Sequence, residues 1–109
     1  MELLYTTFEK MAMAKFLIEI LKADDNIDPN ETGYLFHLQK VLYITDSEVS
    51  DSSLLSHKEA ISIIRDMSHI NKMAFVHIMT QMVHSDGHVD GRESAIMMDI
   101  MFEADLPFN

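Results

Sequence analysis

The feature that most constrains the fold is an internal repeat, in which the chain matches itself with a shift of 62 residues. In each copy an apolar segment of helical character precedes a short acidic loop, and a second helical segment follows the loop. The acidic loops are residues 23–31 and 85–93. The repeat predicts two helix–acidic loop–helix units related by an approximate twofold axis.

Apolar residues recur at helical spacing in both copies, which predicts one buried face on each helix. An apolar residue inside each loop, Ile27 or Val89, precedes an aspartate and is expected to tie the loop to the core. The stripe before the first loop comprises Met13, Phe16, Leu17, Ile20 and Leu21, and that before the second comprises Phe75, Ile78, Met79, Met82 and Val83. After the loops, Tyr34, Leu35 and Leu38 correspond to Ile96, Met97 and Ile100.

Helix-start signals divide the chain into six helical segments. A capping residue followed by Glu three positions later marks starts at Asp28, Thr45 and Ser56, and Ser68 is a further N-cap. The predicted segments are residues 3–22, 29–42, 46–55, 57–67, 69–84 and 91–104. No segment shows the alternation of a strand. We therefore predict an all-α fold, a compact bundle of five or six helices in a single domain that spans residues 1–109.

The net charge of the chain limits the classes of partner that it is expected to bind. Eight basic and eighteen acidic residues give a formal net charge of −10, which disfavours nucleic acid and anionic membranes and favours cations or basic protein surfaces. The chain has no cysteine, which excludes disulfides and thiolate chemistry and is consistent with a reducing compartment. The first residues lack the pattern of a signal peptide, and no apolar run approaches the roughly 20 residues of a membrane span. The expected location is cytoplasmic, without direct membrane insertion.

The repeated pattern Ala/Ser-Asp-Gly/Asp-x-Ile/Val-Asp-x-x-Glu between two helices resembles the tellurite-resistance TerB-like family, which includes the N-terminal domain of a membrane-associated DnaJ-type co-chaperone. The resemblance covers about residues 11–104, although Asp25 stands where the family usually has Gly and the chain is short for the family. It implies an all-helical fold, a role in tellurite or general stress, and acidic loops that bind metal. The family's acidic positions correspond here to Asp24, Asp28, Glu31, Asp86, Asp90 and Glu93.

The chemistry of these six residues suits a divalent cation such as calcium, magnesium or zinc, because hard cations take several oxygen ligands. Asp24 and Asp86 follow a helix C-terminus, where the helix dipole disfavours an anion by about 0.3–1 kcal/mol. The loops are not EF-hands, because position twelve is Leu35 or Met97 instead of a bidentate Glu. Two structural alternatives remain open. The other four acidic residues can be capping-box residues, and Asp24 and Asp86 can lie in solvated turns.

Histidine and methionine offer two further hypotheses. His77, His84 and His88 with Asp86 could form a zinc or nickel site, but two of the histidines occupy repeat positions held by lysines in the first copy, as expected of a solvated polar face. Most of the ten methionines continue helical stripes and are expected to fill the core: Met73, Met79, Met82 and Met97. Met98 or Met101 could instead lie at an interface with a partner helix or a second copy.

No pattern of a catalytic nucleophile or a phosphate-binding loop occurs, so we expect no enzymatic activity. The leading hypothesis is a non-enzymatic stress-response module whose two acidic loops bind a divalent cation or a basic partner. The alternative is a protein-interaction or co-chaperone-like helical module that uses an apolar, Met-containing face, with purely structural loops. A homo-oligomer is compatible with both.

Overall fold

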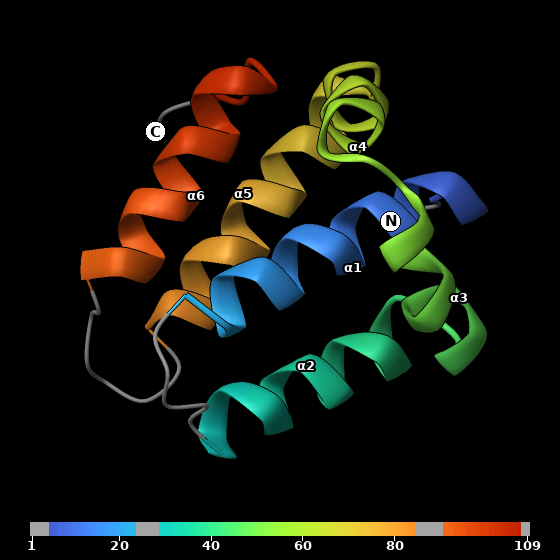
Figure 1. Ribbon diagram of the computed structural model, residues 1–109, viewed down its shortest axis with the longest axis vertical. Helices are drawn as coiled ribbons and strands as arrows, with labels where there is room; N and C mark the ends of the chain where they lie inside the picture. Colours follow the sequence, from blue (N-terminus) through green and yellow to red (C-terminus); the bar gives the residue numbers. More distant parts are fainter. Residues whose placement is uncertain (1–4, 24–28, 85–90, 108–109) are drawn as a thin grey trace.

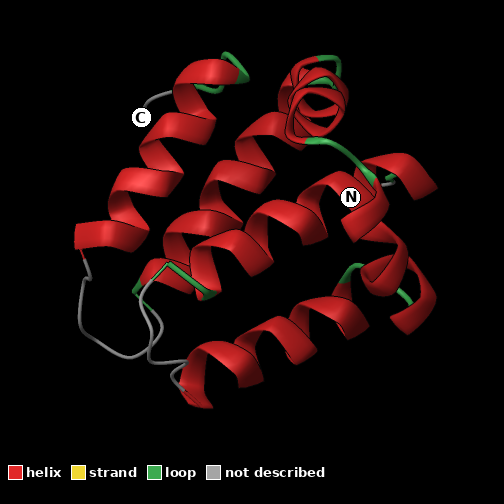
Figure 2. Cartoon of the chain, in the orientation of Figure 1, coloured by secondary structure: helices red, strands yellow, loops and turns green. Residues whose placement is uncertain are grey.

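Six α-helices and one 3-10 helix make up most of the part of the chain that the structure describes. The computed structural model describes residues 5–23, 29–84 and 91–107, with only the backbone of residues 29–32 and 41. No strand occurs within these residues (Figure 2), and the predicted all-α bundle of five or six helices is confirmed. The helices are α1 (Thr7–Leu21), α2 (Pro29–Val41), α3 (Asp46–Asp51), η1 (Ser52–Leu54), α4 (His57–Arg65), α5 (His69–Val83) and α6 (Gly91–Glu103).

Local capping signals set most of the helix starts. Thr45 and Ser56 each accept a hydrogen bond from the N–H of the Glu three residues later, and that Glu accepts one from the cap's own N–H. Both boxes were predicted. The predicted start at residue 3 was wrong, because Thr6 forms an equivalent box with Glu9 and α1 begins only after it. Such caps contribute typically about 1 kcal/mol, which is enough to select one start among neighbouring positions.

Helix α1 lies at the centre of the bundle and contacts every other helix (Figure 1). Its sequence is apolar on most of its circumference, and residues on several sides of it are buried. Helices α4 and α3 with η1 cover it on one side, and α2, α5 and α6 complete its surroundings. The internal repeat pairs α1–α2 with α5–α6, so the segment α3–η1–α4 is an insertion between two similar units.

One hydrophobic core joins the two units, and all ten residues of the two predicted stripes before the acidic loops are buried. Phe16 and Phe75 are fully enclosed. Burying an aliphatic or aromatic side chain of this kind contributes about 1.5–3 kcal/mol. After the loops, Leu38 and Ile100 are buried, while their predicted stripe neighbours are partly buried and pack against the core.

The N-caps and C-caps of α1 and α5 also follow the internal repeat. The N-caps of α1 and α5, Thr6 and Ser68, lie 62 residues apart, and Ser68 accepts a hydrogen bond from the N–H of Asn71. The C-caps are Lys22 and His84, whose backbone angles nearly coincide (φ −92°, ψ 5° and φ −100°, ψ 6°). The repeat therefore describes backbone geometry as well as apolar spacing.

Helices α1 and α5 are the longest in the described part of the chain, with 15 residues each. A bilayer-spanning helix needs about 20 apolar residues. None of the described helices is long and apolar enough to cross a membrane.

Candidate functional site

The six predicted acidic ligands differ in what the structure describes of them. Four of them lie outside the described residues: Asp24, Asp28, Asp86 and Asp90. The same is true of Ile27 and Val89, the apolar loop residues that were expected to tie each loop to the core. The backbone of Glu31 lies in the first turn of α2, and its side chain is not described. Glu93, in the first turn of α6, is described in full. The geometry of the site therefore rests on Glu93 and on the helix ends that flank the two loops.

The flanks of the two loops meet in the fold. Lys22, which directly precedes the first loop, and Ala23, the first residue of that loop, line the same hollow as Ile96 in the second turn of α6. Figure 1 shows the C-terminal ends of α1 and α5 and the starts of α2 and α6 on one side of the molecule. The sequence left open whether the loops lie near each other. The structure answers this for their flanks, because α6 packs directly against α1.

Glu93 is a buried carboxylate, with only 2% of its surface exposed. It belongs to the apolar stripe of α6, since Met97 and Ile100 follow it by one and two helical turns. In the capping boxes of the other helices, Glu at the same helix position is half-buried (Glu9 and Glu48) or exposed (Glu59). A capping role alone therefore does not require burial. Moving a carboxylate out of water is costly unless hydrogen bonds or a cation compensate it.

The position of Glu93 favours a negative charge, and its carboxylate is of a kind that binds cations. It lies in the first turn of a helix, where the helix dipole stabilises negative charge. Its carboxylate supplies the oxygen ligands that calcium and magnesium prefer. No group of three or more His, Cys, Asp or Glu side chains gathers among the described residues. Glu93 is the one predicted ligand whose side chain the structure describes, and the remaining predicted ligands lie in or next to the two loops.

The two described histidines of the alternative metal site lie on the exposed surface of α5. His77 and His84 are exposed, and Nδ1 of His84 lies 2.7 Å from the carbonyl oxygen of Thr80. Their repeat counterparts Lys15 and Lys22 are half-buried and exposed. His88, the third member of the alternative zinc or nickel site, lies outside the described residues.

The methionines divide between core and surface. Met79 and Met82 are fully buried and Met97 packs against the core, as predicted. The prediction for Met73 was wrong, because 46% of its surface is exposed. Met73 lies on the face of α5 that carries His77 and Thr80, away from the buried stripe. Of the two methionines considered for an interface, Met98 is 49% exposed and Met101 is buried.

Comparison with known proteins establishes a relative in fold. The chain is similar to a crystal structure of a protein of unknown function from Porphyromonas gingivalis W83, with a TM-score of 0.85 over 99% of this chain and 90% of that chain. The two sequences are 21% identical, so the likeness concerns the fold alone. The sequence matches no protein-family model and no curated protein.

Proposed function

We propose that this protein is a non-enzymatic module, similar to the TerB-like stress-response proteins, whose two acidic loops bind a divalent cation or a basic partner surface. The proposed ligands are Asp24, Asp28 and Glu31 from the first unit and Asp86, Asp90 and Glu93 from the second. The supporting observation is the burial of Glu93, which is the only buried charged side chain among the described residues. The meeting of the loop flanks supports a shared site.

Glutamate occupies the same position of the first turn in several helices of this protein. Five helices carry Glu in the third position. Of the four whose Glu side chain the structure describes, only Glu93 is enclosed, and it follows an acidic loop and precedes a core stripe. An enclosed carboxylate with a hard cation beside it keeps its charge at low cost, because the cation replaces the water that burial removes. A lysine or arginine from a basic partner could serve in the same way.

Calorimetric titration of the full chain with calcium, magnesium, manganese and zinc tests the cation. We expect heat of binding with at least one of the hard cations, and at least tenfold weaker binding for Glu93→Gln and for the double variant Asp24→Asn/Asp86→Asn. Glu59→Gln is the matched control, since Glu59 holds the same helix position but is exposed. Absence of heat from all four metals would reject cation binding, and a lysine-rich peptide then tests the basic partner by the same variants.

The second candidate is a protein-interaction or co-chaperone-like module that uses an apolar, Met-containing face. The observation that favours it is the exposure of Met73 and Met98, by 46% and 49%, since methionine is common at adaptable binding surfaces. The double aspartate variant separates the two candidates. Partner binding that survives Asp24→Asn/Asp86→Asn and is lost when an exposed methionine is changed supports the second.

A further inference from the structure

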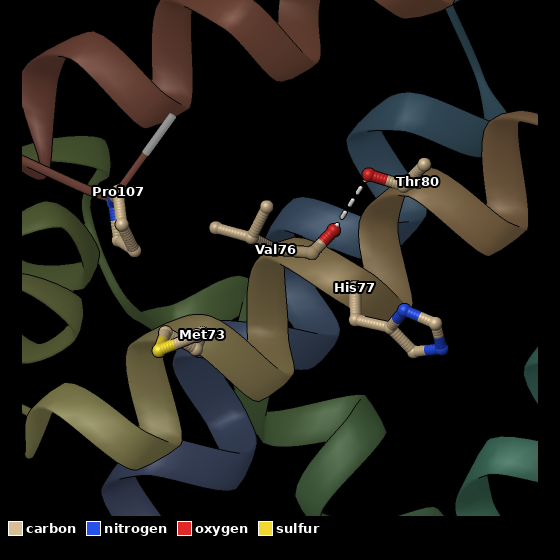
Figure 3. A pocket seen from close by; sticks show the side chains of 5 residues that line it. All are labelled: Met73, Val76, His77, Thr80 and Pro107. Carbon is tan, nitrogen blue, oxygen red and sulfur yellow. Dashed lines mark hydrogen bonds between the residues drawn. The ribbon is translucent and has the colours of Figure 1, made fainter. Parts of the chain in front are cut away.

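Helix α5 and the residue Pro107, which follows α6, enclose a groove between them. The groove has a volume of about 260 Å³ and is lined by Met73, Val76, His77 and Thr80 of α5 and by Pro107. Figure 3 shows Val76 and Met73 on the side of α5 toward Pro107, and the imidazole of His77 on the opposite side. Thr80 donates its hydroxyl hydrogen to the carbonyl oxygen of Val76 at 2.8 Å. The wall of the groove between α5 and Pro107 is therefore apolar.

The apolar wall continues onto the exposed surface of α5. Met73 is 46% exposed, and Ile70, which lies next to it on the helix surface, is 54% exposed. Val76 and Pro107 are half-buried. These four residues, Ile70, Met73, Val76 and Pro107, are called the α5 patch below. A contiguous apolar patch on a protein surface is typical of a contact with another molecule.

Two residues of opposite charge flank the α5 patch. Lys72 lies one helical turn before Val76, and Asp105 lies two residues before Pro107. Asp105 is exposed and Lys72 is half-buried. Neither side chain has an ion-pair partner among the described residues. Such a pair is complementary to a second copy of the same surface, because in a twofold interface the lysine of each copy can contact the aspartate of the other.

The net charge of −10 limits where two copies of this chain can meet. Like charges across an interface are destabilising, so a contact between copies needs a helix with few carboxylates. Of the described α-helices, only α5 contains no acidic residue. Helix α6 also exposes two large apolar residues, Met98 and Phe102. Each of them is followed by an exposed acidic residue, Asp99 or Glu103, so the α6 surface is the less suitable one.

We propose that the α5 patch is the contact between two copies of this chain, related by a twofold axis near Met73. Met73 of each copy packs into the groove of the other, against Val76 and Pro107. Lys72 of each copy lies near Asp105 of the other. The contact area of one short helix face is small, so the dimer is weak and forms at high chain concentration. This inference rests on the second candidate function, to which it assigns a face and a partner, and it does not depend on cation binding by the loops.

Analytical ultracentrifugation of the full chain over a hundredfold range of concentration tests for the dimer. We expect the sedimentation coefficient to rise with concentration. Met73→Asp should weaken the dimer at least tenfold, because it places two like charges beside the twofold axis. Met98→Asp is the matched control and should leave the dimer unchanged, since Met98 is 49% exposed and lies on α6. Helical circular dichroism shows whether both variants fold.

Charge reversal tests the pairing between copies. Lys72→Asp and Asp105→Lys, each alone, should dimerise several-fold more weakly than the wild type, because each brings like charges together. An equimolar mixture of the two variants should dimerise more strongly than either alone, since each chain then supplies the charge that the other needs. An ion pair within one chain cannot give this result, because mixing would leave it unchanged.

The outcomes separate the dimer from the function on which it rests. A chain that stays monomeric at every concentration would overturn the dimer. The second candidate function falls only if a partner binds Met73→Asp and Met98→Asp as well as it binds the wild type. A dimer that Met98→Asp weakens and Met73→Asp does not would overturn the α5 patch as the contact. A mixture no stronger than its two components would overturn the pairing of Lys72 with Asp105.

Discussion

Tyr43 and Asp105 share a left-handed backbone conformation, with φ of 57° and 54°, and lie 62 residues apart. Tyr43 follows the last turn of α2 and Asp105 that of α6. The next residue in each case, Ile44 or Leu106, is buried and donates its N–H to the carbonyl five residues earlier, at 2.8 Å. This is the hydrogen bond of the Schellman turn, with a buried apolar residue after the left-handed one. The two units therefore end in the same way, although neither has the glycine that such turns favour.

Replacing Tyr43 by Gly should stabilise the protein. A side chain in the left-handed region is strained by about 1–2 kcal/mol, and Tyr43 is 77% exposed and forfeits little packing when removed. Part of the gain is lost to the greater freedom of glycine in the unfolded chain. We expect a net rise of about 0.5–1 kcal/mol in the free energy of unfolding, measured by urea denaturation. Asp105→Gly should give a smaller rise, since Asp tolerates this conformation better. A loss of stability in Tyr43→Gly would contradict the assignment.

The cap of α4 should make stability depend on pH. The backbone and side-chain hydrogen bonds of Ser56 hold the pKa of Glu59 below its usual 4.5. A carboxyl with a lowered pKa in the folded state stabilises the protein above its unfolded pKa, and this contribution is lost as the pH falls through the folded pKa. The stability difference between the wild type and Glu59→Gln should therefore be largest near neutral pH and shrink below pH 4.5. Denaturation at several pH values measures it, and a constant difference would contradict the prediction.

Removing the side-chain oxygen of Ser56, the N-cap of α4, should cost more stability than removing the charge of Glu59. Ser56→Ala deletes the oxygen that accepts the hydrogen bond from the N–H of Glu59, at 3.1 Å. We expect a loss of about 1 kcal/mol at neutral pH. Ser62→Ala, an exposed change within the same helix, should stay within about 0.5 kcal/mol. Thermal denaturation distinguishes the two.

The hydroxyl of Tyr5 should contribute nothing to stability. Its oxygen is buried and has no hydrogen-bond partner among the described residues. Burial, followed by the nearby Glu9, raises the pKa of Tyr5, so the hydroxyl stays neutral at ordinary pH. Tyr5→Phe removes an unsatisfied polar group and should leave the free energy of unfolding unchanged or raise it by up to about 1 kcal/mol. Tyr43→Phe, an exposed change, is the control. A loss above about 1 kcal/mol would reveal a hydrogen bond to the hydroxyl.

Two alanine substitutions on α5 should differ in how much stability they cost, because one position is in the core and the other is on the surface. Phe75 is fully buried, and Phe75→Ala should cost about 3–5 kcal/mol through lost burial and a cavity. Ile70 is 54% exposed, and Ile70→Ala should cost well under half as much. Denaturant titration of both variants measures the difference. Similar losses would show that the surface of α5 is covered in solution.

Much of the fold could be predicted from the sequence because its signals are local. Capping pairs three residues apart placed the starts of α3 and α4, and the spacing of apolar residues placed both buried stripes. The start of α1 was placed too early, although Thr6 and Glu9 carried the same signal as Thr45 and Glu48. Of the candidate site, the residue types could be predicted, but the burial of Glu93 could not. It depends on α6 packing against α1 and α5, which lie elsewhere in the chain.

The sequence by itself determined the helices and the repeat, since a helix start, its end and its apolar face depend on residues within a few positions of one another. Only the tertiary structure decided which copy of the repeat lies at the centre. Helix α1 is enclosed because the insertion α3–η1–α4 packs on it, whereas the equivalent face of α5 forms an open groove. Met11 and Met73 show the result, because they share one repeat position and only the first is buried. Burial is a property of what packs against a face, and the face alone does not encode it.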